Sequence, residues 1–175
     1  MKKEVLVVVD MQNDFIDGTL GTKEAVEIVP IVTEYVKGFN GELFFTRDTH
    51  EDNYLDTQEG KNLPVKHCIR GSKGWEICPQ LMEYTKNAVV VDKPTFGSLT
   101  LAEKLADLTR TEEIEKIFLV GLCTDICVIS NAMLIKAALP EVKICVIANA
   151  CAGVSVETHK NALEAMKLCQ IEVVE

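Results

Sequence analysis

The most informative segment of this sequence is Lys116-Ile117-Phe118-Leu119-Val120-Gly121-Leu122-Cys123-Thr124-Asp125-Ile126-Cys127. Its first part, Lys116–Val120, is an apolar run that predicts a buried β-strand. A helical pattern follows over Thr124–Leu139, and Pro140 ends it. A second apolar run, Val142–Ala148, predicts the next strand. Strand, helix and strand in this order indicate two parallel strands joined by a right-handed crossover.

The same alternation of short apolar runs and longer amphipathic stretches extends towards both ends of the chain. The runs are nearly continuous in Val, Ile, Leu and Phe, which is typical of parallel strands buried on both faces. Further strands are predicted at Glu4–Val9, Leu43–Thr46, Ala88–Asp92 and Ile171–Val174. Helices are predicted at Pro30–Gly38, Leu99–Leu108 and Ser155–Cys169, with Pro30 in a first turn and Ser155 as an N-cap. The sequence therefore predicts an α/β fold.

Length and composition favour one globular domain over residues 1–175. No apolar run approaches the roughly 18 residues that a membrane span needs, and the N-terminus lacks the pattern of a secretory signal. We therefore expect a cytoplasmic protein without a membrane partner. The seven cysteines are an odd number, so reduced thiols are expected. A formal charge of −9 without a Lys/Arg-rich stretch excludes a nucleic-acid partner.

Polar groups follow several of the predicted strands at the point where each strand ends. Asp10, Asp48, Lys93 and the Gly121–Cys127 turn all have this position. Ligands of open parallel sheets bind beyond the carboxyl ends of the strands. The long stretch Arg47–Glu76 shows little periodicity, and such a loop in a compact domain is usually functional. We therefore expect these four segments to form a site at one edge of the sheet.

Cys127 is the candidate nucleophile. If Thr124 is the N-cap of the following helix, Cys127 lies in the first turn, where unpaired N–H groups carry partial positive charge. That position lowers the pKa of a thiol, and the free N–H groups can bind a developing oxyanion. The alternatives are a structural cysteine, or a metal or redox pair with Cys123, four residues away.

Asp10 and Lys93 are the candidate activators of this thiol. A partly desolvated aspartate has a raised pKa and can accept a thiol proton. A lysine ammonium beside the thiol favours the thiolate. The alternatives are a capping or solvated carboxylate at Asp10 and a surface lysine at Lys93.

Two of the three histidines fall in the long loop and suggest a metal site. Asp48, His50 and His67 supply one carboxylate and two imidazoles, which suit Zn²⁺, Mn²⁺ or Fe²⁺ with positions left for water or substrate. Glu59 is a candidate fourth ligand, and Asp56 is the second choice. The alternative is a pair of hydrogen-bonding loop histidines. The third histidine, His159, is expected to be an exposed residue in the first turn of the last helix.

These segments together resemble the isochorismatase-like superfamily of cysteine hydrolases. The resemblance spans nearly the whole chain in the right order, and the ordered set is specific although each motif alone is weak. It is carried by Val8-Val9-Asp10-Met11-Gln12-Asn13-Asp14-Phe15, Arg47-Asp48-Thr49-His50, Val91-Asp92-Lys93, Gly121-Leu122-Cys123-Thr124-Asp125-Ile126-Cys127-Val128 and Cys151-Ala152-Gly153-Val154-Ser155.

The resemblance implies a three-layer α/β/α, Rossmann-like fold with a six-stranded, mainly parallel sheet. It implies a catalytic triad of Asp10, Lys93 and Cys127. It also implies a cis peptide bond between Leu122 and Cys123, which would direct the amides of Cys123 and Cys127 towards the substrate oxygen. Homo-oligomers are common among related proteins, so a homo-oligomer is expected.

Nicotinamidases within this superfamily add a metal site that matches Asp48, His50 and His67. The metal, with zinc as the first choice and manganese or iron as alternatives, anchors the pyridine nitrogen of the substrate. Many nicotinamidases have a histidine where this chain has Asp56, and Glu59 resembles a glutamate that some of them use.

The resemblance therefore implies a nicotinamidase-type amidase that converts nicotinamide to nicotinate and ammonia through a thioester. Phe15 and Leu122 are expected to line the substrate pocket, with Trp75 as a further candidate. Pro64 stands where nicotinamidases often have an aromatic residue, which leaves another small carboxamide as an alternative substrate. Two rival functions are an Fe(II) oxygenase that uses only the metal site and a non-catalytic binding module on the same fold.

Overall fold

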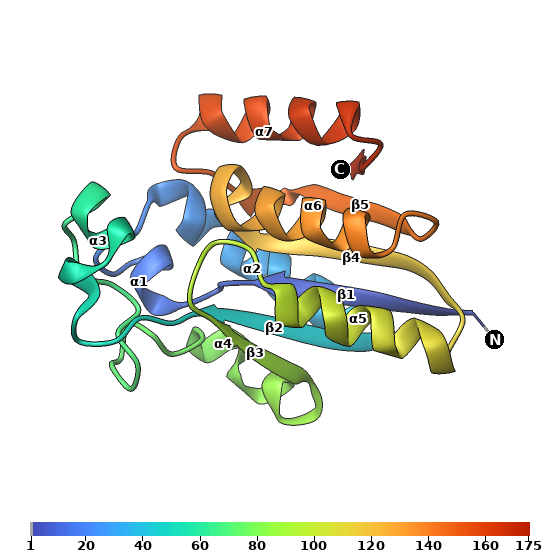
Figure 1. Ribbon diagram of the computed structural model, residues 1–175, viewed down its shortest axis with the longest axis horizontal. Helices are drawn as coiled ribbons and strands as arrows, with labels where there is room; N and C mark the ends of the chain where they lie inside the picture. The colour runs from blue at the N-terminus through green and yellow to red at the C-terminus, as the bar shows by residue number, and fades with distance from the viewer. Residues whose placement is uncertain (1) are drawn as a thin grey trace.

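The computed structural model describes residues 2–175, and its centre is a sheet of six parallel strands in the order β3-β2-β1-β4-β5-β6 (Figure 1). Every predicted strand overlaps an observed one, and the predicted parallel sheet is confirmed. The strands are β1 (Lys3–Val9), β2 (Glu42–Asp48), β3 (Val89–Lys93), β4 (Ile114–Leu122), β5 (Lys143–Ala152) and β6 (Glu172–Val174).

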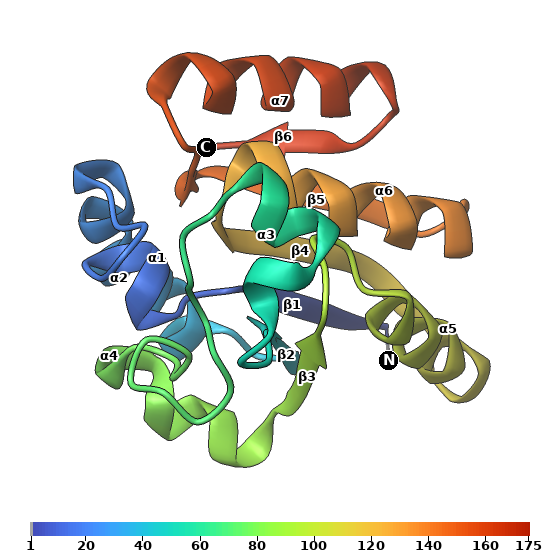
Figure 2. The same ribbon diagram turned by 60° about the vertical axis from the view of Figure 1, so that its left-hand side comes forward.

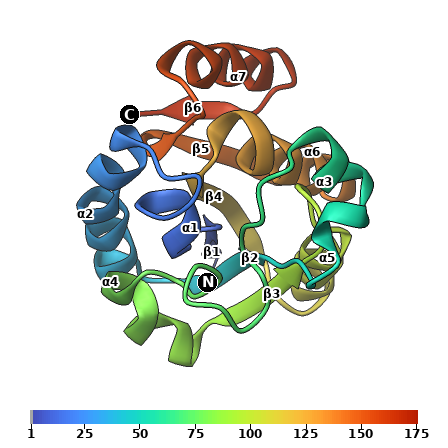
Figure 3. The same cartoon turned by 90° about the vertical axis from the view of Figure 1, so that its left-hand side faces the viewer.

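Helices cover both faces of this sheet, so the predicted three-layer α/β/α fold is confirmed (Figure 3). Helices α2 and α4 pack on one face, and α5, α6 and α7 pack on the other. The longer helices are α2 (Lys23–Gly38), α5 (Leu99–Thr111), α6 (Ile129–Ala138) and α7 (Val156–Leu168). The short ones are α1 (Asn13–Ile16), α3 (Gln58–Asn62) and α4 (Pro79–Met82).

Alternation along the central strands supplies a hydrophobic core on each side of the sheet. In β1, Leu6 and Val8 belong to the core under α2, whereas Val5, Val7 and Val9 belong to the core under α5 and α6. All five side chains are buried. Successive side chains of a strand point to opposite faces, so a strand that is apolar at every position must be covered on both sides.

Helix α2 corrects one prediction. It begins at Lys23, where the Thr22 side chain accepts a hydrogen bond from Ala25 N, and Pro30 lies inside the helix rather than in its first turn. A proline there removes one internal hydrogen bond. The apolar face that α2 buries against the sheet outweighs this cost, and Pro30 itself is exposed.

The stretch Arg47–Glu76 contains more structure than its sequence pattern suggests. It forms a 3₁₀ turn at Tyr54–Asp56 and the short helix α3, whose N-cap Thr57 accepts from Gly60 N. This loop lies over the carboxyl ends of the central strands (Figure 2). It is therefore in a position to supply side chains to a site there.

Gly121 brings β4 close to β1 at this same edge. Its φ is +114°, and a Cβ at this position would lie 2.1 Å from the Val9 carbonyl oxygen. Only glycine combines that backbone conformation with such a close approach. The pairing of β4 with β5 shifts register between Leu119 and Gly121, so the strand changes course just before the Cys123–Cys127 turn.

Within residues 2–175, no helix is long and apolar enough to cross a membrane.

Candidate functional site

The carboxyl ends of four neighbouring strands bring the predicted polar groups together. Asp10 follows β1, Asp48 ends β2, Lys93 ends β3, and the turn after β4 contains Cys127. Register fixes their mutual positions, because Asp48 pairs with Lys93 across β2 and β3 and Val9 pairs with Gly121 across β1 and β4. Segments far apart in the sequence therefore share one edge of the sheet, as expected.

Lys93 stands between the other two members of the predicted triad. Its Nζ lies 2.7 Å from Asp10 Oδ2 and 3.5 Å from Cys127 Sγ. Asp10 and Lys93 are fully buried, and Cys127 is 5% exposed. Three ionisable side chains from separate segments thus meet in a buried position, and only Cys127 has a small exposed fraction.

Thr46 fixes the Asp10 carboxylate. Its hydroxyl donates to Asp10 Oδ1 over 2.6 Å and accepts from the Asp10 main-chain N–H over 3.2 Å. Asp10 adopts a φ of +46°, a left-handed conformation that aspartate tolerates better than most residues. Burial raises the pKa of the Asp10 carboxyl, and the opposing charge of Lys93 lowers it by less. A carboxyl with a raised pKa is better matched to accepting a thiol proton.

The Lys93 ammonium is held in its charged form. It donates to Thr95 O over 3.1 Å and to Asp48 Oδ1 over 3.3 Å, in addition to its ion pair with Asp10. Burial lowers the pKa of Lys93, but the neighbouring negative charges, Asp10 first, raise it above the ordinary value. Lys93 therefore acts as a fixed positive charge in the site.

The pKa of Cys127 differs from the sequence-based expectation. Burial raises it, and Lys93 lowers it by less, while Asp10 and Asp48 raise it further, so the net shift is upward. A position in a first helical turn does lower a thiol pKa, but desolvation and two carboxylates outweigh that effect here. The resting residue is a thiol, which needs a base to become a nucleophile.

The turn that contains Cys127 is a π-helical turn, Thr124–Val128, that leads into α6. The predicted cis peptide bond joins Leu122 and Cys123. The Cys123 carbonyl accepts from Ile126 N over 3.1 Å and from Val128 N over 3.0 Å, but not from the N–H of Cys127, which lies between them in the sequence. Thr124 is not the N-cap that was predicted, because Cys123 has that position and no side chain caps the turn.

A cavity of about 330 Å³ opens beside this turn. It contains Cys127 and Cys123, and Phe15 forms part of its wall as predicted. Leu122 does not line it: this side chain is fully buried in the core on the α2 face. Trp75 does not line it either, since its indole N–H donates to Thr49 Oγ1 over 2.9 Å. The other lining residues are Leu20, Thr22, Asp48, Glu59, Leu63, His67, Phe96, Ile126 and Val154.

A larger and more open cavity of about 630 Å³ lies between α2 and α4. It contains Asp14 and Lys73 but none of the predicted catalytic side chains. We therefore place the candidate site in the smaller cavity, because that one contains Cys127.

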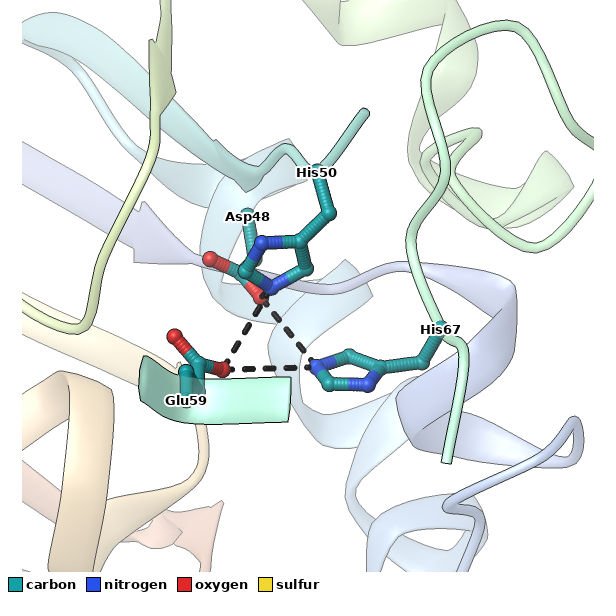
Figure 4. A group of neighbouring side chains, drawn as sticks. All are labelled: Asp48, His50, Glu59 and His67. Carbon is teal, nitrogen blue, oxygen red and sulfur yellow. Dashed lines mark ion pairs between the residues drawn. The ribbon is translucent and has the colours of Figure 1, made fainter. Parts of the chain in front are cut away.

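The predicted metal ligands gather in one group (Figure 4), and three of them, Asp48, Glu59 and His67, line the same cavity. One ligand atom each from Asp48, His50, Glu59 and His67 lies within 4.8 Å of the others. His50 Nε2 is 2.8 Å from Asp48 Oδ2 and 3.4 Å from Glu59 Oε1. Asp56 is exposed and outside this group, so Glu59 from α3 has the fourth position.

The chemistry of this group fits a divalent metal ion. His50 Nε2 is buried without a hydrogen-bond partner of good geometry. His67 Nδ1 lies 2.8 Å from the Val65 carbonyl, which fixes the tautomer that presents a free Nε2 lone pair to the group. Burial lowers the pKa of His50, but Asp48 and Glu59 raise it to about 9. The two carboxylates that favour the positively charged form of His50 would equally favour a metal cation at the same place.

Gln12 holds Asp48 in place from behind. Its side-chain oxygen accepts from Asp48 N over 2.7 Å, and its amide nitrogen donates to Asp48 O over 2.9 Å and to Trp75 O over 2.8 Å. Burial alone would raise the pKa of Asp48, but the two histidines and Lys93 hold it well below its usual range. One Asp48 oxygen faces Lys93 and the other faces the histidines, so this carboxylate joins the two parts of the site.

A family model described as the isochorismatase domain matches residues 4–175. The chain belongs to the isochorismatase family. The nicotinamidase/pyrazinamidase of Mycobacterium tuberculosis is 26% identical over 97% of both chains. The nicotinamidase of Escherichia coli is 25% identical over 96% of this chain and 92% of its own length. The crystal structure of the pyrazinamidase of Pyrococcus horikoshii in complex with zinc has a TM-score of 0.80, with 28% identity over 99% of both chains.

The names of these relatives bear on the predicted activity of this member of the isochorismatase family. They are amidases by name, so the predicted enzyme class, a hydrolase that acts on the carbon–nitrogen bond of an amide, is confirmed. The P. horikoshii protein was crystallised in complex with zinc, and this chain has a group of side chains that could hold a metal ion.

Several polar residues of this isochorismatase-family site were not predicted. Thr46 lies two residues before Asp48 in β2, so the period of a strand places both on one face. Asn131 lies four residues after Cys127, on the same face of the helix, and its amide donates to Cys127 O over 2.8 Å. Its oxygen accepts from Ser98 N over 2.9 Å. These spacings were the available signals.

His159 corrects another prediction. It is half-buried rather than exposed, and its Nδ1 lies 2.8 Å from Thr124 Oγ1. Burial lowers the pKa of His159 below its ordinary value. The sequence gives no sign of this contact, because the two residues are 35 positions apart and meet only through the packing of α7.

Proposed function

We propose that this chain hydrolyses a small carboxamide, with nicotinamide as the first candidate, to the carboxylic acid and ammonia. Cys127 is the nucleophile, Asp10 the general base and Lys93 the fixed positive charge. The observation that carries the proposal is the position of Lys93 Nζ, 2.7 Å from Asp10 Oδ2 and 3.5 Å from Cys127 Sγ, at a cavity large enough for a small molecule.

In the first half-reaction, Asp10 accepts the thiol proton while Cys127 Sγ forms a bond to the amide carbonyl carbon. The main-chain N–H groups of Cys123 and Cys127 donate to the oxyanion. The carbon–nitrogen bond then breaks, and Asp10 returns the proton to the leaving nitrogen. Ammonia departs and leaves a thioester on Cys127.

In the second half-reaction, Asp10 accepts a proton from a water molecule whose oxygen attacks the thioester carbonyl carbon. The carbon–sulfur bond breaks, the proton passes to sulfur, and the acid leaves. Lys93 remains an ammonium throughout. The net reaction consumes one amide and one water and yields one acid and one ammonia.

A divalent metal would be held by Asp48, His50, His67 and Glu59, with zinc as the first choice and manganese or iron as alternatives. When bound, it supplies a Lewis-acid anchor for a ring nitrogen of the substrate. Phe15 lies beside His67 with ring centroids 5.6 Å apart, and it provides an aromatic wall against which a substrate ring would pack. An anchored and stacked ring would present its carboxamide to Cys127.

The substitution Cys127→Ala tests this assignment. It should lower kcat/KM for amide hydrolysis roughly 10³-fold or more, because it removes the sulfur that forms the proposed thioester. Ammonia release is the measurement, and trapping of an acyl-enzyme by mass spectrometry identifies the intermediate. Cys145→Ala is the matched control, since it removes another buried thiol that does not line the cavity. Wild-type turnover by the Cys127 variant would reject the proposal.

Another small carboxamide is the second candidate substrate. Pro64 is not part of the cavity wall. The phenyl side chains that line the wall are those of Phe15 and Phe96. A panel of nicotinamide, benzamide and aliphatic amides distinguishes the candidates. Nicotinamide should be preferred to benzamide, which lacks a ring nitrogen, only if the metal anchors the substrate.

A further inference from the structure

Asp14 reaches from α1 to the loop that carries one of the proposed metal ligands. Its Oδ2 accepts from the Cys68 main-chain N–H over 2.7 Å, and Cys68 directly follows His67. A hydrogen bond with a carboxylate as acceptor is shorter and stronger than one between neutral groups. The proposed hydrolysis gives Asp14 no part in the reaction, so the purpose of this contact lies elsewhere.

Cys68 has a main-chain conformation that needs support. Its φ is +46°, in the left-handed region where a residue other than glycine is strained. Cys68 is fully buried, so water does not compete with the Asp14 carboxylate for its N–H. The hydrogen bond to Asp14 therefore favours this conformation of Cys68 over the more common ones.

The same segment connects the two histidines of the metal group (Figure 4). The Cys68 carbonyl accepts from His50 N over 3.0 Å, and His50 O accepts in turn from Arg70 N over 2.8 Å. The peptide group that donates to Asp14 joins His67 to Cys68, so one hydrogen bond fixes the orientation of that peptide. A change in the Cys68 main chain would therefore displace both histidines.

The Asp14 carboxylate is itself held in a narrow space. Its Oδ1 accepts from the Thr19 hydroxyl over 3.1 Å, and the Asp14 N–H donates to Gly74 O over 3.0 Å. Two glycines leave room for the carboxylate: a Cβ at Gly18 would lie 2.8 Å from Oδ1, and a Cβ at Gly74 would overlap the carboxylate group. A side chain confined in this way can fix the position of its partner.

Helix α1 makes a second contact with this loop. The Phe15 ring lies beside the His67 imidazole, with centroids 5.6 Å apart and an interplanar angle of 57°. The Val65 carbonyl lies 2.8 Å from Nδ1 of the same imidazole. With the main chain also held by Asp14, the His67 side chain has little freedom to leave the metal group.

We propose that Asp14 is a positioning residue of the metal site: by binding the Cys68 N–H, it holds the two histidines in the arrangement that a divalent ion needs. The inference rests on the metal binding that is part of the proposed function. Asp14 is not one of the four ligands, and it does not line the cavity that contains Cys127. Its loss should therefore weaken metal binding and leave the thiol unchanged.

The affinity of the purified protein for Zn²⁺, measured by competition with a chromophoric chelator, tests the inference without any substrate. Asp14→Ala should weaken zinc binding about 10- to 100-fold, the usual effect of losing a group that orients metal ligands. Asp14→Asn keeps an oxygen that can accept from Cys68 N and should stay within about fivefold of the wild type. Asp17→Ala removes an exposed carboxylate three residues further on and is the matched control, with wild-type affinity expected.

Alkylation of Cys127 by iodoacetamide, in the metal-free protein, separates lost positioning from general damage. The rate in Asp14→Ala should stay within about twofold of the wild type, because Asp14 and Cys127 line different cavities. A much larger change in this rate would show that Asp14 maintains the fold of the whole site. That result would overturn the inference.

The substitution Cys68→Gly tests how Asp14 acts. Glycine adopts a positive φ without strain, so the conformation at this position should depend less on the carboxylate. The loss of zinc affinity caused by Asp14→Ala should be at least about threefold smaller in the Cys68→Gly background than in the wild type, and the packing lost with the thiol cancels in this comparison. An equal or larger loss would contradict the proposed action through Cys68.

His50→Ala separates failure of this inference from failure of the metal site. Zinc binding that is weakened by His50→Ala but unchanged in Asp14→Ala would overturn the positioning role alone. A wild-type protein that binds no zinc, or one whose binding His50→Ala leaves unchanged, would overturn the metal site and this inference together. Neither result bears on hydrolysis at Cys127, which the Cys127→Ala enzyme tests.

Discussion

The Lys93 ammonium has four partners in the site, and they define its chemistry. Its ammonium has three oxygen partners, two of them carboxylates, and it also lies against the Cys127 sulfur. A positive charge held by buried carboxylates cannot be given up easily at neutral pH. The proton that the proposed reaction moves must therefore travel between Cys127 and Asp10.

The substitution Asp10→Asn separates the two effects of that carboxylate. Asp10 raises the pKa of the Cys127 thiol, so its removal should lower that pKa and increase the thiolate fraction at pH 7. Alkylation of Cys127 by iodoacetamide should then be faster than in the wild type, while amide hydrolysis falls roughly 10²-fold or more for lack of a base. The alkylation is quenched at set times, and mass spectrometry then measures the modified fraction of Cys127.

The pH profile of this alkylation provides a second readout. In the wild type, the rate should rise without a plateau between pH 7 and 9, because burial holds the pKa of Cys127 above its ordinary value. Asp17→Asn, an exposed carboxylate, should leave the profile unchanged. Slower alkylation of the Asp10→Asn protein would contradict the direction of the electrostatic effect.

The strands and helices could be predicted from sequence where burial alone decides them. Apolar runs such as Val5–Val9 admit one interpretation, a strand covered on both faces. Elements decided by tertiary contacts could not be predicted. Helix α2 continues through Pro30 because its apolar face is buried, and α3 exists because the loop packs over the strand ends.

In the candidate site, too, the positions after strands could be predicted from sequence, whereas properties that depend on tertiary contacts could not. Motif positions after strands predicted that Asp10, Lys93 and Cys127 would meet, since the carboxyl ends of parallel strands lie at one edge. The raised pKa of Cys127 was missed, because it depends on how many charges surround a buried sulfur. The contact of Thr124 with His159 was missed because it crosses between elements.

At the scale of an element, Gly121→Ala should destabilise the junction of β1 and β4. A side chain there needs a φ of +114° and meets the Val9 carbonyl oxygen. We expect a loss of at least about 2 kcal/mol in the free energy of unfolding, measured by urea denaturation.

Gly38→Ala is the control for that prediction. Gly38 is the last residue of α2, and a Cβ there has no heavy atom within 4 Å. Its replacement should be neutral or stabilise by about 0.5–1 kcal/mol. Equal losses from both substitutions would show that the close approach at Gly121 is not what requires glycine.

At the scale of the whole molecule, metal binding should be coupled to stability. The four ligands come from β2, the segment after it, α3 and the loop before Cys68, so the ion would bind only when these segments are folded together. Free metal at 100 times its Kd should raise the free energy of unfolding by about 2.7 kcal/mol, which corresponds to a Tm increase of roughly 5–10 °C for a chain of this size.

Differential scanning calorimetry of the metal-free and metal-loaded protein measures this shift, and metal content is quantified in parallel. His50→Ala and Glu59→Gln should bind less metal and show a smaller shift. Asp56→Asn is the control, because this exposed carboxylate lies outside the ligand group. A full shift in His50→Ala would contradict the site.

The same calorimetric trace tests whether residues 1–175 unfold as one unit, as the sequence predicts, since one domain should give a single transition. The expected homo-oligomer stays a prediction. Sedimentation equilibrium of the purified chain measures the subunit number.

One oxygen of Asp48 contacts the ammonium of Lys93, and the other contacts the imidazoles. This double role limits which substitutions the site can accept. Under the proposed function, a variant that exchanges His50 and His67 for other side chains would lose two metal ligands but keep Asp10, Lys93 and Cys127. It could not exchange Asp48 as freely, because the same change would remove a partner of Lys93. Metal binding and the position of the Lys93 ammonium thus both depend on the Asp48 carboxylate.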